Sequence, residues 1–156
     1  MNETTFDTPT ERELVTTRSF DAPRDLVWAA WTSTEHVPHW LLGPDGWSMP
    51  VCEIDLRPGG KWSYVWRNDA DGSEFGMHGE YREVEAPERL VATEVWEDNP
   101  PAVNTLVLTE EDGRTTVTQT SLFPSQEARD AAIATGMNDG VAKSFDRLDG
   151  HLRTMA

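Results

Sequence analysis

The sequence predicts an α+β fold in which a curved antiparallel sheet of about seven strands packs against two short helices and a long C-terminal helix. Three observations lead to this prediction. A strand-like segment is followed by two short helical segments near the N-terminus. Turn signals then divide residues 47–123 into several strands, and the last thirty or so residues repeat apolar side chains at helical spacing.

The chain is expected to begin with a flexible tail. Residues 1–12 are polar and rich in threonine, without the positively charged start and apolar run of a signal peptide. Glu13–Phe20 then alternates apolar and polar residues, which predicts the first strand. A single folded domain is therefore predicted over residues 13–156, a length that suits one domain with its own core.

Two short helices are predicted after the first strand. The segment Asp21-Ala22-Pro23 provides an N-cap region with a proline near the first turn. The apolar residues behind it recur at helical spacing: Leu26, Val27, Ala30 and Trp31. Thr34 is predicted to cap the second helix, which Gly43-Pro44 ends.

Turn signals divide the segment from Trp47 to Phe123 into about six strands. They are Pro58-Gly59-Gly60, Asn68–Gly72, Ala86-Pro87, Asn99-Pro100-Pro101 and Asp112-Gly113. None of the gaps is long enough for a crossover helix, so the strands are expected to form an antiparallel meander.

Ser125 is predicted to start one long amphipathic helix. Its apolar stripe consists of Ile133, Met137, Val141, Phe145, Leu148 and Leu152. Three glycines within it each weaken the helix by about 1 kcal/mol relative to alanine, so packing on the sheet must stabilise it. These elements, in this order, make the helix-grip arrangement.

Period-two alternation places one set of side chains from each strand on the face that should look at the long helix. That inner set is Trp62, Tyr64, Trp66, Phe75, Met77, Gly79, Tyr81, Leu106, Leu108, Val117, Gln119 and Ser121. For residues 91–97 the pattern leaves two alternatives open, with either Val91, Thr93 and Val95 or Ala92, Glu94 and Trp96 facing inward. Any single aromatic residue in this set is more often a core residue than a ligand contact.

Three segments carry a resemblance to a known family. They are Asp55–Trp62, Gly79–Val84 and Pro87–Leu90, and further matching segments extend from Phe20 to Leu152 in the same order. The chain resembles the activator of heat-shock-protein-90 ATPase homologue-like (AHSA-type) family of the START-type, birch-pollen-allergen-like (SRPBCC, Bet v-type) superfamily. One departure is Val141, where related chains often carry tryptophan.

The resemblance implies a cavity for apolar ligands between the sheet and the long helix, and it favours the inward set with Glu94 and Trp96. The expected lining is Trp40, Trp62, Tyr64, Trp66, Phe75, Met77, Tyr81, Glu94, Trp96, Leu106, Leu108, Val117, Gln119, Ile133, Met137 and Val141. Desolvation would raise the pKa of an inward Glu94. A register slip of one residue would instead turn it to water.

Three functions are compatible with these residues. The leading expectation is a protein that binds a small hydrophobic ligand, without a cofactor. A chaperone ATPase co-activator or stress-response adaptor rests on the resemblance alone. A cyclase or hydrolase would need Glu94 as acid or base, but no catalytic set is predicted, and an enzyme is the less favoured reading.

Charge restricts the partners. The net charge is −15 and the only lysines are Lys61 and Lys143, which argues against nucleic acid and against anionic membranes. A salt-adapted source or a GC-rich genome would explain this acidic, arginine-biased composition. The sequence is compatible with a monomer or a homodimer.

The cysteine and histidine residues predict neither a disulfide nor a metal site. Cys52 is the single cysteine and is expected to be a small buried residue, so a cytoplasmic location follows in the absence of a membrane-spanning run. His36 and His39 lie three residues apart, but no further ligand nearby completes a metal set, so both are expected at the surface, as is His78.

Overall fold

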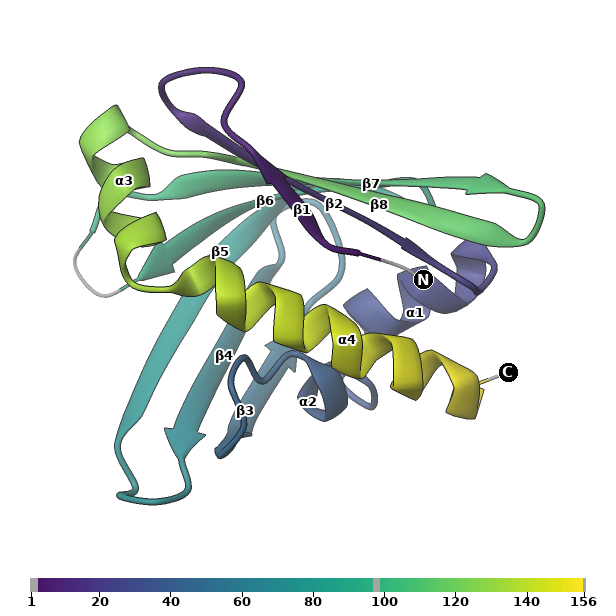
Figure 1. Ribbon diagram of the computed structural model, residues 1–156, viewed down its shortest axis with the longest axis horizontal. Helices are drawn as coiled ribbons and strands as arrows, with labels where there is room; N and C mark the ends of the chain where they lie inside the picture. The colour runs from purple at the N-terminus through teal and green to yellow at the C-terminus, as the bar shows by residue number, and fades with distance from the viewer. Residues whose placement is uncertain (1–2, 97–98, 156) are drawn as a thin grey trace.

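The computed structural model describes residues 3–96 and 99–155, and its strands form one antiparallel sheet (Figure 1). Eight strands are described, in the spatial order β1-β2-β8-β7-β6-β5-β4-β3. Their bounds are β1 Thr5–Asp7, β2 Glu13–Phe20, β3 Trp47–Ile54, β4 Lys61–Asn68, β5 Glu74–Glu85, β6 Arg89–Trp96, β7 Ala102–Glu111 and β8 Arg114–Leu122. The predicted antiparallel meander is confirmed over β3 to β8. Glu97, assigned to the sixth strand from the sequence, lies outside the described residues.

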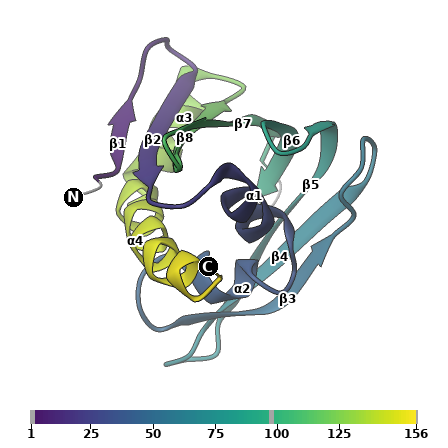
Figure 2. The ribbon, with the colours of Figure 1, turned by 90° about the vertical axis from the view of Figure 1, so that its right-hand side faces the viewer.

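The helices fill the concave side of this sheet. Their bounds are α1 Arg24–Thr32, α2 Val37–Trp40, α3 Gln126–Ala134 and α4 Met137–Met155. Figure 2 shows the sheet curling around α1, with α4 lying across its open side. The arrangement is a helix-grip fold, as the sequence predicts. None of the helices in the described part of the chain is long and apolar enough to span a membrane.

The flexible tail is the first correction. Thr5–Asp7, within the predicted tail, forms the edge strand β1 and pairs with residues 15–17 of β2. Alternation over three residues is too short a signal to distinguish a strand from a polar tail. The pairing with β2 makes this segment a strand. Residues 1–2 of the expected tail lie outside the described residues.

The single C-terminal helix is the second correction. It is two helices, α3 and α4, and the break lies at Gly136, whose φ is +87°. The amide of Gly136 bonds to the carbonyl of Ile133, which closes the last turn of α3 in the manner of a left-handed C-cap. The N-terminus of α3 is as predicted, since Ser125 Oγ accepts from the amide of Ala128 at 3.0 Å.

The start of α2 also differs from the prediction. Thr34 does not cap it, because α2 begins at Val37 with His36 in the N-cap position and no side-chain cap. The turn that leads into it is organised by Ser33, whose carbonyl accepts from the amides of His36 and Val37 and whose hydroxyl accepts from Glu35. A hydroxyl residue one position earlier thus takes the local role assigned to Thr34.

The core is packed most tightly where α1, α2 and the C-terminal half of α4 meet the sheet. Trp40 is fully buried, donates its indole N–H to the carbonyl of Ala30 at 2.9 Å and packs against Trp31. Phe145 of α4 contacts Phe20 and Trp31 edge to face. These aromatic contacts fix α4 against the sheet at this end.

A buried arginine links β2 to α4. Arg18 is only 3% exposed, and its guanidinium donates to Asp146 and Asp149, both at 2.6 Å. Both carboxylates lie on α4, on the helix face that meets the sheet edge. This pair of bridges helps hold α4 across the open side of the sheet.

The sheet bends where β5 meets β6, and Gly79 permits the bend. A Cβ added there would lie 1.8 Å from the carbonyl oxygen of Thr93 and 2.7 Å from the indole nitrogen of Trp62. That oxygen accepts the indole N–H of Trp62 at 3.1 Å, while the Thr93 hydroxyl accepts from the amide of Glu80. Only a residue without a side chain allows these groups to meet over β5.

Candidate functional site

The residues predicted to line a cavity fall into three groups by burial. Seven are buried: Trp40, Trp62, Trp66, Tyr81, Leu106, Leu108 and Val117. Seven are half-buried: Tyr64, Met77, Glu94, Gln119, Ile133, Met137 and Val141. Two are exposed, Phe75 at 37% and Trp96 at 38%. The set therefore runs from the packed core through a half-buried region to an exposed rim.

The register of β6 places Glu94 on the concave face. Leu90 pairs with Leu106 and Ala92 pairs with Asn104, so even-numbered residues of β6 share the face of Leu106. Asn104 donates a hydrogen bond from its side-chain nitrogen to Glu94 Oε2. Of the two alternations open from the sequence, the one with Ala92, Glu94 and Trp96 is therefore the observed one.

Three half-buried side chains of this face have polar atoms without a side-chain hydrogen-bond partner. The hydroxyl of Tyr64, the side-chain amide of Gln119 and Glu94 Oε1 make no side-chain hydrogen bond to another described residue. Among the described residues, the buried side-chain polar atoms without a partner are Arg18 Nε and Asn138 Oδ1. The hydroxyl of Tyr64, the side-chain amide of Gln119 and Oε1 of Glu94 are thus accessible to water, although all three side chains belong to the concave face.

Desolvation dominates the electrostatics of this face. Burial raises the pKa of Glu94, against the opposing effect of the hydrogen bond from Asn104. Burial also raises the pKa of Tyr64 well above its ordinary value, and the nearby Tyr81, Cys52 and Glu94 add to that effect. The four groups therefore form one low-dielectric polar cluster, and no cation contributes to these shifts.

A continuous row of aromatic rings leads from this cluster to the rim. Trp62 and Tyr64 lie 4.8 Å apart between ring centroids, and Tyr64 and Trp66 lie 5.8 Å apart. Phe75 stacks on Trp66 at 5.2 Å and contacts Trp47 at 5.4 Å. The row thus connects the half-buried polar cluster with exposed aromatic surface along β4 and its neighbours.

The helix side of this region is also incompletely packed. In the C-terminal half of α4, Phe145, Leu148 and Leu152 are buried. Towards the N-terminal end, Met137 and Val141 remain half-buried although they continue the same apolar stripe. The sheet–helix interface is therefore tight at one end of α4 and looser at the other.

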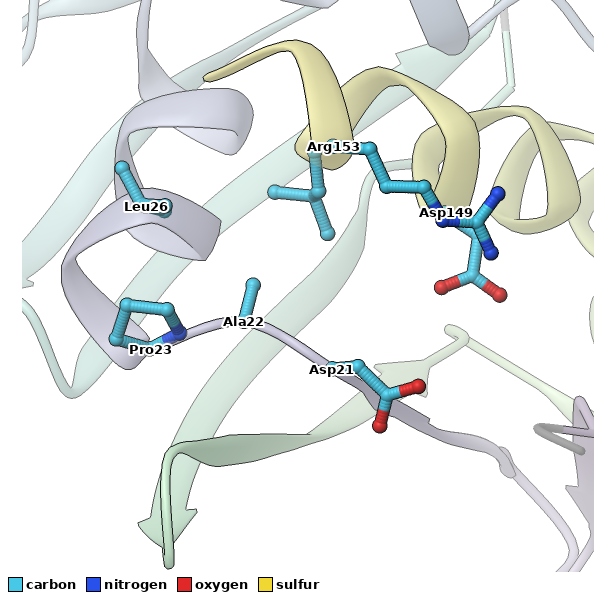
Figure 3. A pocket seen from close by; sticks show the side chains of 7 residues that line it. Asp21, Ala22, Pro23, Leu26, Asp149 and Arg153 are labelled. Carbon is cyan, nitrogen blue, oxygen red and sulfur yellow. The ribbon is translucent and has the colours of Figure 1, made fainter. Parts of the chain in front are cut away.

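Two hollows lie elsewhere on the surface. One, of about 220 Å³, lies between the start of α1 and the end of α4 (Figure 3) and is lined by Asp21, Ala22, Pro23, Leu26, Asp149, Leu152 and Arg153. The other, of about 380 Å³, is an open depression by the β3–β4 turn, lined by Glu53, Ile54, Asp55, Arg57, Gly59 and Lys61. Neither contains a residue of the predicted cavity set, and the first is smaller than ligand pockets of roughly 300–1,000 Å³.

The first hollow has acidic groups that are already neutralised. Asp149 accepts from Arg18 at 2.6 Å, and Asp21 pairs with Arg114 at 2.7 Å. Both carboxylates therefore hold structural partners and are not free to bind a ligand. Its position marks the C-terminal end of α4, opposite the half-buried region.

His39 is exposed, as expected, whereas His36 is half-buried, and both contact His151 of α4. His36 Nδ1 lies 3.0 Å from His151 Nε2, and His39 stacks on His151 with 5.3 Å between ring centroids. Burial, followed by the charges of His36 and His39, lowers the pKa of His151. The described residues contain no group of three histidine, cysteine or acidic side chains placed to hold a metal ion. His78 is exposed, as predicted.

Two residues of this region were not singled out from the sequence. Asn104 and Trp47 belong to the concave face, Asn104 by its pairing with Ala92 and Trp47 by its contact with Phe75. Cys52 is half-buried rather than fully buried, and burial raises its pKa to about 11. The alternation that includes Leu106 and Leu108 would have identified Asn104.

Comparisons with known proteins give one consistent result. A family model described as "Activator of Hsp90 ATPase homolog 1-like protein" matches residues 21–153. A crystal structure of a Rhodobacter sphaeroides protein is similar, with 29% identity and a TM-score of 0.91 over 97% of this chain and 99% of that one. A Staphylococcus epidermidis protein solved by NMR has 26% identity and a TM-score of 0.84, covering 97% of this chain and 95% of that one. No curated protein matches the chain.

Proposed function

This chain belongs to the Activator of Hsp90 ATPase homolog 1-like family, and from that premise we propose that it binds a small apolar molecule on the concave face of its sheet. The site is the half-buried region formed by Tyr64, Met77, Glu94, Gln119, Met137 and Val141. Trp96 and Phe75 form its rim.

One observation carries the proposal. The hydroxyl of Tyr64, Oε1 of Glu94 and the side-chain amide of Gln119 lack side-chain hydrogen-bond partners among the described residues and remain accessible to water. A packed core would bury such groups only with partners, because an unsatisfied buried polar group costs about 1–3 kcal/mol. A few accessible polar groups on a mainly apolar and aromatic face are typical of small-molecule sites.

The incomplete packing of α4 supports the same location. Met137 and Val141 keep accessible surface while the same stripe is buried from Phe145 onward. An apolar ligand would cover this surface together with Met77, at a gain of about 25 cal/mol for each Å² removed from water. Binding would thus complete the core at this end of the helix.

The test is a titration with the neutral, apolar dye Nile red. Met77→Trp and His78→Trp insert the same indole at neighbouring positions of β5, on opposite faces of the sheet, and His78 is exposed. We expect Met77→Trp to weaken dye binding at least about tenfold, because the indole occupies the contact area of the ligand. His78→Trp should leave the affinity unchanged.

A second variant approaches the same space from the helix. Val141→Trp should also weaken dye binding, and urea unfolding of each variant shows that the protein is folded. If the dye binds and neither inward variant changes its affinity, it occupies another site and the proposal is wrong. Failure of the folded wild-type protein to bind the dye would also overturn it.

A second candidate function is favoured by the two exposed aromatic residues. Phe75 and Trp96 present large apolar side chains at one rim of the sheet, and such patches often contact protein partners. The partner suggested by the family's description is the Hsp90 ATPase. Stimulation of that ATPase, reduced by Phe75→Ser and Trp96→Ser, would support this function, and no stimulation by the wild-type protein would remove it.

A further inference from the structure

The geometry points to a chemical class for the ligand. Building on the proposed binding function, we infer that the concave site selects an apolar amine, whose ammonium group pairs with Glu94 while its hydrocarbon part contacts the aromatic row.

The concave face offers a negative group without a positive one. The described positions of β4 to β8 on this face are Trp62, Tyr64, Trp66, Asn68, Phe75, Met77, Gly79, Tyr81, Val84, Leu90, Ala92, Glu94, Trp96, Ala102, Asn104, Leu106, Leu108, Glu110, Thr115, Val117, Gln119 and Ser121. The acidic residues of that set are Glu94, which is half-buried, and Glu110, which is exposed and accepts from the amide of Arg24. The set contains no lysine, arginine or histidine.

Two basic side chains that point into the core of the fold are already engaged. Arg18 lies on the same face of β2, but its guanidinium is paired with Asp146 and Asp149. Arg147 of α4 donates to the carbonyls of Trp40 and Gly43. A ligand carboxylate or phosphate would therefore enter this site without a counter-charge, at a large desolvation cost.

Glu94 has one oxygen available to a ligand. Oε2 accepts the side-chain N–H of Asn104, which fixes the orientation of the carboxyl group. Oε1 makes no hydrogen bond to another described residue and is not among the buried partnerless atoms. A primary ammonium group can donate to this oxygen, and a charge-assisted bond in a desolvated site is about twice as strong as a neutral one.

The aromatic side chains suit a cation as well as a hydrocarbon chain. Tyr64 lies near enough to Glu94 for that carboxyl group to contribute to the raised pKa of its hydroxyl, and Trp62 and Trp66 flank Tyr64. The faces of tryptophan and tyrosine rings attract ammonium groups by about 0.5–2 kcal/mol, depending on desolvation. The row beyond them offers apolar surface for the rest of the ligand.

The net charge of the whole protein also favours a cationic ligand. With a net charge of −15, its field attracts cations and repels anions before contact. This long-range effect is not specific to the site, so the experiment must separate it from the pairing with Glu94. High salt does so, because at about 1 M the screening length falls to about 3 Å.

The test uses three probes with the same alkyl chain: decylamine, decanol and decanoate. Their affinities are measured by calorimetry at neutral pH in about 1 M NaCl, with the wild-type protein and with Glu94→Gln and Glu80→Gln. Glu80 is exposed on the other face of β5, so its substitution removes the same charge outside the site. We expect decylamine to bind at least about tenfold more tightly than decanol, and decanoate to bind weakest.

Glu94→Gln should weaken decylamine at least about tenfold and change decanol by less than about threefold, while Glu80→Gln changes neither. Equal affinities of decylamine and decanol, or equal losses for both glutamine variants, would overturn the selection of amines and leave the binding function intact. If none of the three probes binds, the binding function fails with it.

Discussion

Replacing an apolar residue of α4 by alanine should cost far more at one end of the helix than at the other. Leu148 lies in the packed half and Met137 in the half-buried half, and both belong to the same apolar stripe. Both residues and alanine are good helix formers, so intrinsic propensity changes little in either variant. The comparison therefore measures packing.

The magnitudes follow from burial. Leu148 is 0% exposed and belongs to the core cluster with Phe145 and Val117, so Leu148→Ala loses its full transfer free energy and leaves a cavity, at about 3–4 kcal/mol. Met137 keeps accessible surface. Met137→Ala loses only part of its burial and leaves no closed cavity, so it should cost less than about 1.5 kcal/mol.

Urea unfolding of the two variants and the wild-type protein, without ligand, measures these costs, provided that the slopes agree. A difference of at least about 1.5 kcal/mol is expected between the variants. Equal costs would refute the reasoning, because they would mean that the N-terminal end of α4 is packed as tightly as the other. The concave site would then have no space.

Three further predictions concern stability. Gly136→Ala should destabilise the protein by about 1–2 kcal/mol, because alanine is strained at φ +87°. Gly150→Ala should stabilise it by up to about 1 kcal/mol, because the space around an added Cβ is open and alanine is the better helix former. Thermal unfolding of the two variants measures both effects. Burial raises the pKa of Glu94 in the folded protein, so wild-type stability falls as pH rises from the pKa of an unfolded glutamate to the folded pKa. The fall is up to about 1.4 kcal/mol per pH unit. Glu94→Gln removes this loss, so it should leave stability unchanged below the unfolded pKa and raise it above that pH. A pH series of urea midpoints in which the two proteins stay parallel would contradict this. Arg18→Met should cost about 1–3 kcal/mol by leaving Asp149 half-buried and unpaired, and adding Asp149→Asn should recover part of it in a double-mutant cycle.

The fold could be predicted from the sequence because its signals are local and repeated. Alternation and turn residues define β3 to β8, and the apolar stripe defines the C-terminal helical segment. Two features depend on tertiary context instead. Thr5–Asp7 becomes a strand only because β2 offers an edge, and the helix breaks at Gly136 because that glycine adopts a left-handed conformation rather than continuing the helix.

The sequence predicts which face of the sheet carries the candidate site, but not how deeply its side chains are buried. Period-two alternation assigns Tyr64 and Met77 to the concave side, and the register confirms Glu94 there. Alternation carries no information on how closely α4 approaches, so it could not separate the buried Val117 from the half-buried Gln119, two residues further along β8. Nor could it place Phe75 at an exposed rim, because that depends on where the helices end.

The location of the ligand can be measured directly with the chain's own methionines. The five methionines are Met1, Met49, Met77, Met137 and Met155, and NMR of selectively labelled methyl groups reports on each during titration with decylamine. The account predicts shifts at Met77, on the sheet, and Met137, on the helix, because both lie at the proposed site, with Met49 and Met155 unchanged. Shifts at Met155 with Met77 and Met137 unmoved would place the ligand at the far end of α4 and contradict the account.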